Sequence, residues 1–129
     1  MKRDMELVRE VLLRVEGLDG PPGSRWLCRS FDPEFQIEGW SGDEVDHHLR
    51  LLADADFLLN AKAANDGVML SGLSWKGCEF LDTVRSPEVW RRTKEAAGKI
   101  GGVSISILAE IAKATAKTVI KEHLGLDLG

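Results

Sequence analysis

The chain has 129 residues, 43% of them hydrophobic, and a formal net charge of −4 at pH 7. This length suits one domain with its own core and is short for two. The negative charge excludes bulk attraction to nucleic acid or to an anionic membrane, so either contact would need a local basic face. No apolar run approaches the ~18 residues that are required to span a bilayer, which excludes a membrane span.

Two cysteines, Cys28 and Cys78, lie far apart and lack the spacing of a metal site. The first residues, MKRDMELV, are charged and do not resemble a secretory signal. We therefore expect a cytoplasmic protein with both thiols reduced.

The first predicted element is a helix over residues 4–16. Apolar side chains repeat there at helical spacing, namely Met5, Val8, Leu12 and Val15. Gly17 suits a left-handed cap at the end of this helix. Residues 17–34 hold three glycines and three of the four prolines, which predicts a loop. The alternation in residues 35–40, FQIEGW, predicts a short third strand.

Residues 41–81 have the pattern of a helix, a hairpin and a second helix, as in a winged-helix unit. Ser41 predicts a helix cap, and Asp43 and Glu44 suit the positive end of the helix that follows. The turn residues Asn65-Asp66-Gly67 predict a tight connection between strands in 57–63 and 68–70.

Three more helices are predicted after the hairpin. They begin after Ser74, Ser86 and Ser104, each of which is a favoured capping residue. Trp75 and Trp90 fall on apolar faces of the first two, so we expect both in the core. Ile100 continues the apolar face of the second helix, and Gly125 ends the third helix.

Together these elements predict a mainly α (α+β) fold. Its core is winged-helix-like, with a small two- or three-stranded sheet and C-terminal helices. We expect a winged-helix-like domain over residues 1–103 and a C-terminal amphipathic helix over 104–129. That helix either packs on the domain or forms a homodimer interface, and we favour the dimer because the earlier helices already supply much apolar cover.

Several segments resemble a known family, namely MKRDMELVREVL, IEGWSGDEVDHHLRLL and LSWKGCEFLDTVRSPEVWRRTKEAAGKIGG. In this order the chain resembles domain of unknown function 2513, a family of small bacterial and prophage proteins. The resemblance implies a winged-helix-like centre and a role in phage or mobile-element regulation or in host-phage conflict, but no activity. Relatives usually have Gly-Leu-Ile where this chain has Asp56-Phe57-Leu58.

Winged helices often place the helix before the wing in the DNA major groove. Here that helix region carries five carboxylates against Arg50, and the predicted wing adds only Lys62. Affinity for duplex DNA depends on Lys and Arg that neutralise phosphates, so DNA binding is disfavoured at this helix. The alternative, a DNA-binding transcriptional regulator, would use the basic residues around the helix that follows Pro87, namely Arg85, Arg91, Arg92, Lys94 and Lys99.

We find no pattern that indicates an enzyme, a cofactor or a metal. His47 and His48 are adjacent, so on a helix they point about 100° apart and cannot hold one ion alone. We expect His48 to be partly buried and His47 to be exposed. Neither cysteine has a neighbouring His or basic residue that would make it a nucleophile. The glycines near residue 100 follow a helix and do not form a phosphate loop.

Tryptophan beside carboxylates suits a surface that recognises a basic protein partner. We therefore predict a non-catalytic protein that acts by protein-protein interaction. The predicted protein-binding residues lie at and around the acidic helix, namely Trp40, Asp43, Glu44, Asp46, His47 and Arg50.

Overall fold

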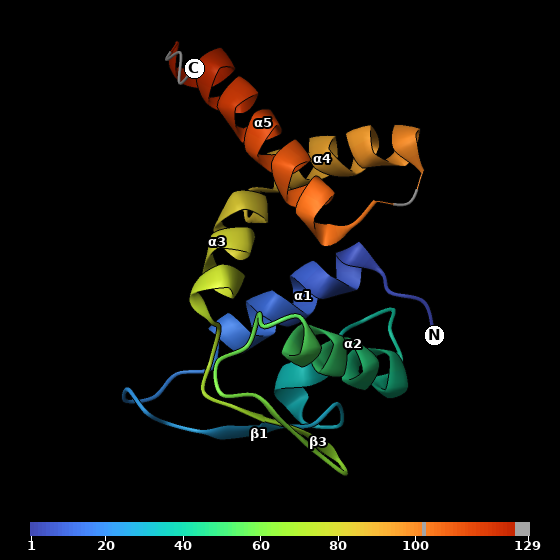
Figure 1. Cartoon of the computed structure of the whole chain (residues 1–129), viewed down its shortest axis with the longest axis vertical. Helices are drawn as coiled ribbons and strands as arrows, with labels where there is room; N and C mark the ends of the chain where they lie inside the picture. The colour runs from blue at the N-terminus through green and yellow to red at the C-terminus, as the bar shows by residue number, and fades with distance from the viewer. Residues whose placement is uncertain (102, 126–129) are drawn as a thin grey trace. The chain divides into compact units, whose positions relative to one another are not determined.

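The computed structural model describes residues 1–101 and 103–125 (Figure 1). It confirms a mainly helical α+β fold with a small three-stranded antiparallel sheet. The elements in chain order are α1 (Met5–Glu16), β1 (Trp26–Cys28), η1 (Pro33–Phe35), α2 (Gly42–Asp54), β2 (Lys62–Ala64), β3 (Gly67–Leu70), α3 (Trp75–Val84), α4 (Pro87–Ile100) and α5 (Ile105–Leu124). No helix among the described residues is long and apolar enough to cross a membrane.

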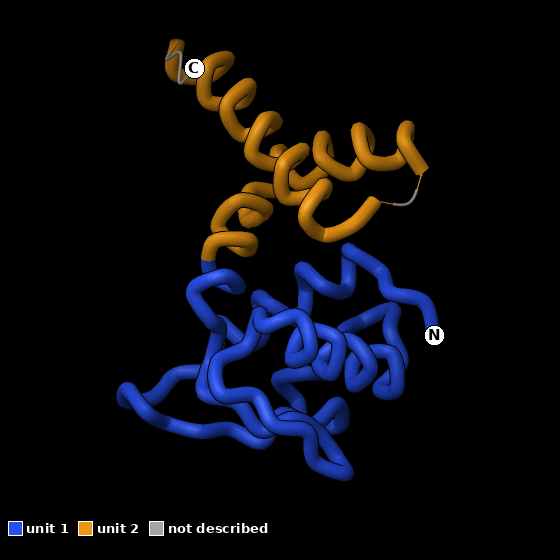
Figure 2. Tube along the Cα trace, in the orientation of Figure 1, with its two compact units in different colours: residues 1–78 blue, residues 79–129 orange. Residues whose placement is uncertain are grey.

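The chain forms two compact units, residues 1–78 and residues 79–129 (Figure 2). We call them the winged unit and the helical unit. The boundary falls inside α3.

The sheet of the winged unit has the strand order β1-β3-β2, and both pairs are antiparallel. Trp26 lies opposite Leu70, and Ala64 lies opposite Gly67 across the tight turn at the tip of the hairpin. A helix, a strand, a short helix, a long helix and a hairpin follow one another, which is the element order of a winged helix. The predicted hairpin is confirmed, although β2 is shorter than the run from 57 to 63.

The third strand was predicted in the wrong place. Residues 35–40 form the end of η1 and turns, whereas the third strand is Trp26–Cys28, inside the predicted loop. Phe35 and Ile37 are buried, so the alternation of apolar and polar residues in this segment reflects burial of the apolar side chains and not pairing in a strand. Gly39 has a φ of 89°, which breaks an extended conformation.

The two long helices of the winged unit begin as predicted. The Asp4 side chain accepts a hydrogen bond from the N–H of Glu6 at the start of α1. Gly17 ends α1 with a φ of −70°, so the predicted left-handed cap is wrong. Its N–H instead reaches the carbonyl of Leu13 in ordinary helical geometry.

The core of the winged unit draws on both long helices and the sheet. α1 and α2 pack against each other, and α2 contacts β3. The largest fully buried side chains of this unit are Phe35, Phe57, Leu7, Leu12, Leu49, Leu52, Leu70, His48, Val8 and Val11. The sheet therefore contributes one buried face, since Val68 and Leu70 are buried while Met69 between them is partly exposed.

In the helical unit, α4 and α5 pack against each other. Ser86 and Ser104 cap them as predicted, and Gly125 ends α5 in the left-handed conformation, with a φ of 68°. Trp90 is 3% exposed, as expected, but Ile100 is 66% exposed at the last residue of α4. The predicted apolar face therefore ends one turn earlier, at Ala97.

The start of α3 passes directly over the loop that follows α2. A Cβ at Gly77 would overlap the backbone oxygen of Phe57, so this close approach requires glycine. Lys76 lies over the Phe57 ring, and its ammonium donates a hydrogen bond to the carbonyl of Ala55. The loop and the helix thus meet backbone to backbone.

We expect Gly77→Ala to destabilise the protein by at least ~1 kcal/mol, because the overlap with Phe57 outweighs the better helix propensity of alanine. Gly98 in α4 is the matched control, since nothing lies within 4 Å of a Cβ at that position. Gly98→Ala should raise stability by up to about 1 kcal/mol. Thermal unfolding followed by circular dichroism measures both, and equal shifts of the two midpoints would contradict the argument.

Candidate functional site

Four of the six predicted protein-binding residues, Asp43, Asp46, His47 and Arg50, lie along one side of α2, together with Asp54. Asp43 and Asp54 are exposed, and Asp46, His47 and Arg50 are partly exposed. At 100° per residue these five positions fall within one arc of the helix. We call the carboxylates Asp43, Asp46 and Asp54 the acidic face of α2.

Glu44 has a structural task at the start of α2. The N–H of Glu44 donates to Ser41 Oγ at 3.1 Å, and the N–H of Ser41 donates to Glu44 Oε1 at 3.0 Å. This reciprocal capping box satisfies two backbone donors that the helix leaves free. The hydrogen bonds from Ser41 lower the pKa of Glu44, so its carboxylate stays charged at neutral pH.

Arg50 connects α2 to the tip of the hairpin. Its Nε donates to Asp46 Oδ2 at 2.8 Å, and its Nη2 donates to the carbonyl of Ala64 at 2.8 Å. A longer bond of 3.4 Å reaches the carbonyl of Asn65. The cation of α2 is therefore held by a carboxylate and by two backbone oxygens of the hairpin.

Asp46 reaches further into the protein than the rest of the acidic face. Its Oδ1 is buried and has no hydrogen-bond partner among the described residues. The other oxygen accepts from Arg50, so the pair with Arg50 is what compensates the carboxylate. Asp46 is for this reason a structural residue as well as part of the acidic face.

The histidine pair is divided between core and surface. His48 is 1% exposed, more buried than expected, and its Nε2 accepts from the N–H of Asp4 at 2.8 Å. Because Nε2 is the acceptor, Nδ1 carries the proton and donates to the carbonyl of Glu44 at 2.8 Å. His47 is partly exposed, with its ring 5.5 Å from that of His48. No group of three or more metal-ligating side chains occurs in the described part of the chain.

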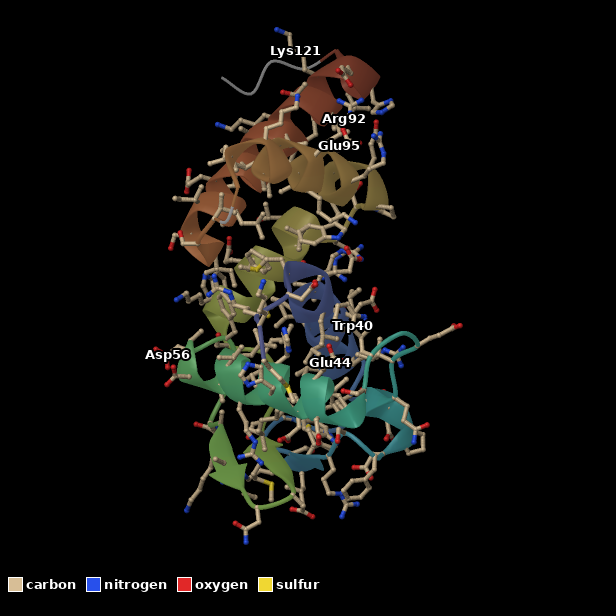
Figure 3. All side chains as sticks on the ribbon, turned by 90° about the vertical axis from the view of Figure 1, so that its right-hand side faces the viewer. Trp40, Glu44, Asp56, Arg92, Glu95 and Lys121 are labelled. Carbon is tan, nitrogen blue, oxygen red and sulfur yellow. The ribbon has the colours of Figure 1, made fainter. Side chains whose placement is uncertain are left out.

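Trp40 lies beside the start of α2 and is partly exposed, as predicted (Figure 3). It lines a hollow of about 210 Å³ together with residues from η1 and the following turn, which include Phe35, Ile37 and Glu38. The partly exposed side chain of Trp40 therefore lies next to the acidic face.

Trp75 was predicted in the core, and this prediction is wrong, since it is 82% exposed. The buried residues of α3 are Gly77, Phe80, Leu81 and Val84. Trp75 comes two residues before Gly77, which places it roughly opposite that face at 100° per residue. The helical spacing itself was the signal that could have placed Trp75 on the surface.

The five residues of the alternative DNA-binding prediction all lie in the helical unit, and their positive charge is largely compensated. Arg85 pairs with Asp82 at 2.7 Å and Arg91 pairs with Glu95 at 3.1 Å. Arg92 pairs with Glu88 at 3.2 Å and with Glu122 at 2.9 Å. Figure 3 labels Arg92 and Glu95 on α4. Lys94 lies over the Trp90 ring, and Lys99 is exposed.

The two cysteines differ in burial. Cys28 is 1% exposed, and burial, with Asp32 and Glu34 nearby, raises the pKa of its thiol to about 12. Cys78 is exposed on α3. The thiolate is the reactive form, so Cys28 is a small buried apolar side chain at neutral pH.

A thiol reagent such as Ellman's reagent should therefore modify one thiol of the native protein rapidly at pH 7. The fast phase should disappear in Cys78→Ser and remain in Cys28→Ser, while Cys28 should react only in denaturant. Absorbance of the released thiolate measures both phases. Two thiols reacting at equal rates in the native protein would contradict the assignment.

The capping box predicts a pH dependence of stability. The pKa of Glu44 is lowered from 4.5 in the folded state, so its stabilising effect is present above pH 4.5 and is lost as the pH falls through the folded value. Glu44→Gln keeps an oxygen for the Ser41 N–H and removes the titration. The free energy of unfolding, measured by urea between about pH 3 and 7, should therefore depend less on pH in this variant. Parallel profiles of the two proteins would show that Glu44 does not contribute.

Two comparisons place the chain among known proteins, while no solved structure matches it. A relative from Haemophilus influenzae (strain Rd), named "Uncharacterized protein", is 28% identical over 127 residues, which are 96% of this chain and 99% of that protein. The model of a family described as "Hypothetical protein (DUF2513)" matches residues 2–104. This match covers most of the chain and both strands of the hairpin, so the chain belongs to the DUF2513 family.

Proposed function

We propose that this chain is a non-enzymatic winged-helix-like protein that binds a partner protein with a basic surface. The contact would use the acidic face of α2 with Trp40 at its edge. In line with the family resemblance, we further propose that this binding serves regulation in phages or mobile elements, or host-phage conflict.

The sign of the charge on α2 is the observation that carries this proposal. α2 follows η1 and precedes the hairpin, which is the position of the helix that winged-helix proteins insert into DNA. Asp43 and Asp54 are exposed on it, and Asp56 follows it in the chain (Figure 3). These carboxylates would repel phosphates and attract lysine or arginine side chains.

The cations of the winged unit do not reverse this sign. Arg50 is bound to Asp46 and to the hairpin backbone, so its guanidinium is not free for phosphates. At the hairpin, Lys62 is exposed, but Asp66 lies at the turn and is 3.8 Å from Arg29. Residues 1–78 carry nine Lys and Arg against 14 Asp and Glu, a formal net charge of −5.

The mixture of side chains also fits a protein partner. Interfaces draw most of their affinity from a few anchors, among which Trp is enriched, and charges around them set orientation and association rate. Trp40 offers such an anchor, and Asp43 lies three residues beyond it in the sequence. The core residues of α2 lie on its other side, so Asp43 takes no part in the packing of this helix.

The alternative of DNA binding through α4 has weaker support. Arg85, Arg91 and Arg92 each already pair with at least one carboxylate of the helical unit. Phosphates would have to compete with these carboxylates, so the helix offers little net attraction.

Asp43→Lys should weaken partner binding at least about tenfold, because it places a cation opposite a basic surface. Asp19→Lys makes the same change of charge in the exposed loop after α1 and should leave binding unchanged. Affinity purification from the host, quantified by mass spectrometry, followed by titration calorimetry with the captured protein, compares the variants. Equal capture by both variants would remove α2 from the proposal.

A mobility-shift assay with mixed-sequence duplex DNA at low salt tests the alternative. We expect no shift at concentrations at which the protein partner is bound. A salt-sensitive shift that Arg91→Ala and Arg92→Ala abolish would favour DNA binding and reverse the order of the two functions.

A further inference from the structure

The helical unit contains a groove of about 700 Å³ that belongs to none of the surfaces described above. It lies between the end of α3, the start of α4 and the middle of α5. Val89, Val119 and Ile120 line the groove with apolar side chains. Ala114 and Ala116 line its α5 side with small side chains. All residues that line it lie between 79 and 120, so the groove belongs to the helical unit alone.

Most of the long helix α5 is not buried within the chain. Only Leu108 and Ala112 of its 20 residues are buried, and none of residues 113–124 is. Ile107 is 50% exposed and Leu124 is 67% exposed. A helix normally derives its stability from packing an apolar face, so about three turns of α5 lack the cover that such a helix usually has.

The two walls of the groove differ in charge. Glu79 and Asp82 stand on the α3 wall, whereas the α5 wall carries Lys113 and Lys117 together with Glu110. Asp82 pairs with Arg85, and Lys113 pairs with Glu110 at 3.5 Å. Among the described residues, Glu79 and Lys117 have no ion-pair partner. The groove therefore offers an unpaired charge of each sign, on opposite walls.

We propose that a second copy of this chain fills the groove with its own α5, in a two-fold symmetric dimer. A two-fold axis pairs the same patch on both copies, so the lysine edge of each α5 meets the acidic wall of the other. Lys117 of one copy then faces Glu79 of the partner copy, and this contact occurs twice. The apolar residues Val119 and Ile120 face the partner's groove and gain the cover that they lack within one chain.

The charge pattern favours a second copy over an unrelated helix. An unrelated partner would need an acidic edge for Lys117 and a basic edge for Glu79 on one narrow helix. The chain already carries both edges at the required places, because α3 supplies the acid and α5 supplies the base. Small residues at Ala114 and Ala116 also permit a close approach of two helices.

Sedimentation equilibrium of the full chain tests the dimer. We expect the wild type to sediment as a dimer at about 100 μM, a hundredfold above a dissociation constant of about 1 μM. Glu79→Lys and Lys117→Glu should each weaken the dimer at least ~10-fold, because each creates two like-charge contacts. Both side chains are exposed, so circular dichroism should show unchanged helix content.

An equal mixture of the two variants separates the dimer contact from a folding defect. In the mixed pair, the lysine introduced at position 79 of one variant faces the glutamate introduced at position 117 of the other. The second contact keeps its native Glu79 and Lys117, so the mixture should form a one-to-one heterodimer about as tight as the wild-type dimer, although each variant alone dimerises at least ~10-fold more weakly. A monomeric wild type, a dimer that neither variant weakens, or a mixture that associates no more tightly than the single variants would each overturn the proposal.

Discussion

The pair formed by Asp46 and Arg50 is the interaction on which the winged unit and its proposed function both depend. Arg50 ties the middle of α2 to the carbonyl of Ala64 at the hairpin, so helix and wing hold a fixed relation. The same bonds occupy the guanidinium of Arg50, the cation that α2 carries. Removal of Arg50 would leave Asp46 without its hydrogen-bond donor, and its Oδ1 is already buried without a partner, so the loss destabilises the folded state. What stabilises the wing thus also leaves the exposed end of α2 with negative charge.

Helices and hairpin could be predicted because their signals are local. Ser41, Ser86 and Ser104 cap helices through their own hydroxyls, and Asn65-Asp66-Gly67 is a local turn sequence between the paired strands β2 and β3. β1 could not be predicted in the same way. It has three residues, and it exists because Cys28 and Trp26 pair with β3 some forty residues later in the chain.

The surface was harder to predict from the sequence than the core. Asp43 and Trp40 lie where the helix pattern places them, but the bonds from Arg50 to the hairpin depend on the tertiary structure. Trp75 was assigned to the apolar face of its helix, but it is 82% exposed, on the side of α3 opposite Gly77. The groove beside α5 joins three helices and has no sequence signature at all.

Asp56 occupies a backbone conformation that few side chains tolerate. Its φ is 62°, in the left-handed region that glycine adopts most easily and that aspartate tolerates better than most residues. The glycine that the family resemblance leads us to expect at this position would adopt the same backbone conformation easily. Here aspartate adds one more exposed carboxylate just after the end of α2, close in sequence to the exposed carboxylate of Asp54. The carboxylate at this position therefore adds to the negative charge through which, in our proposal, α2 selects its partner.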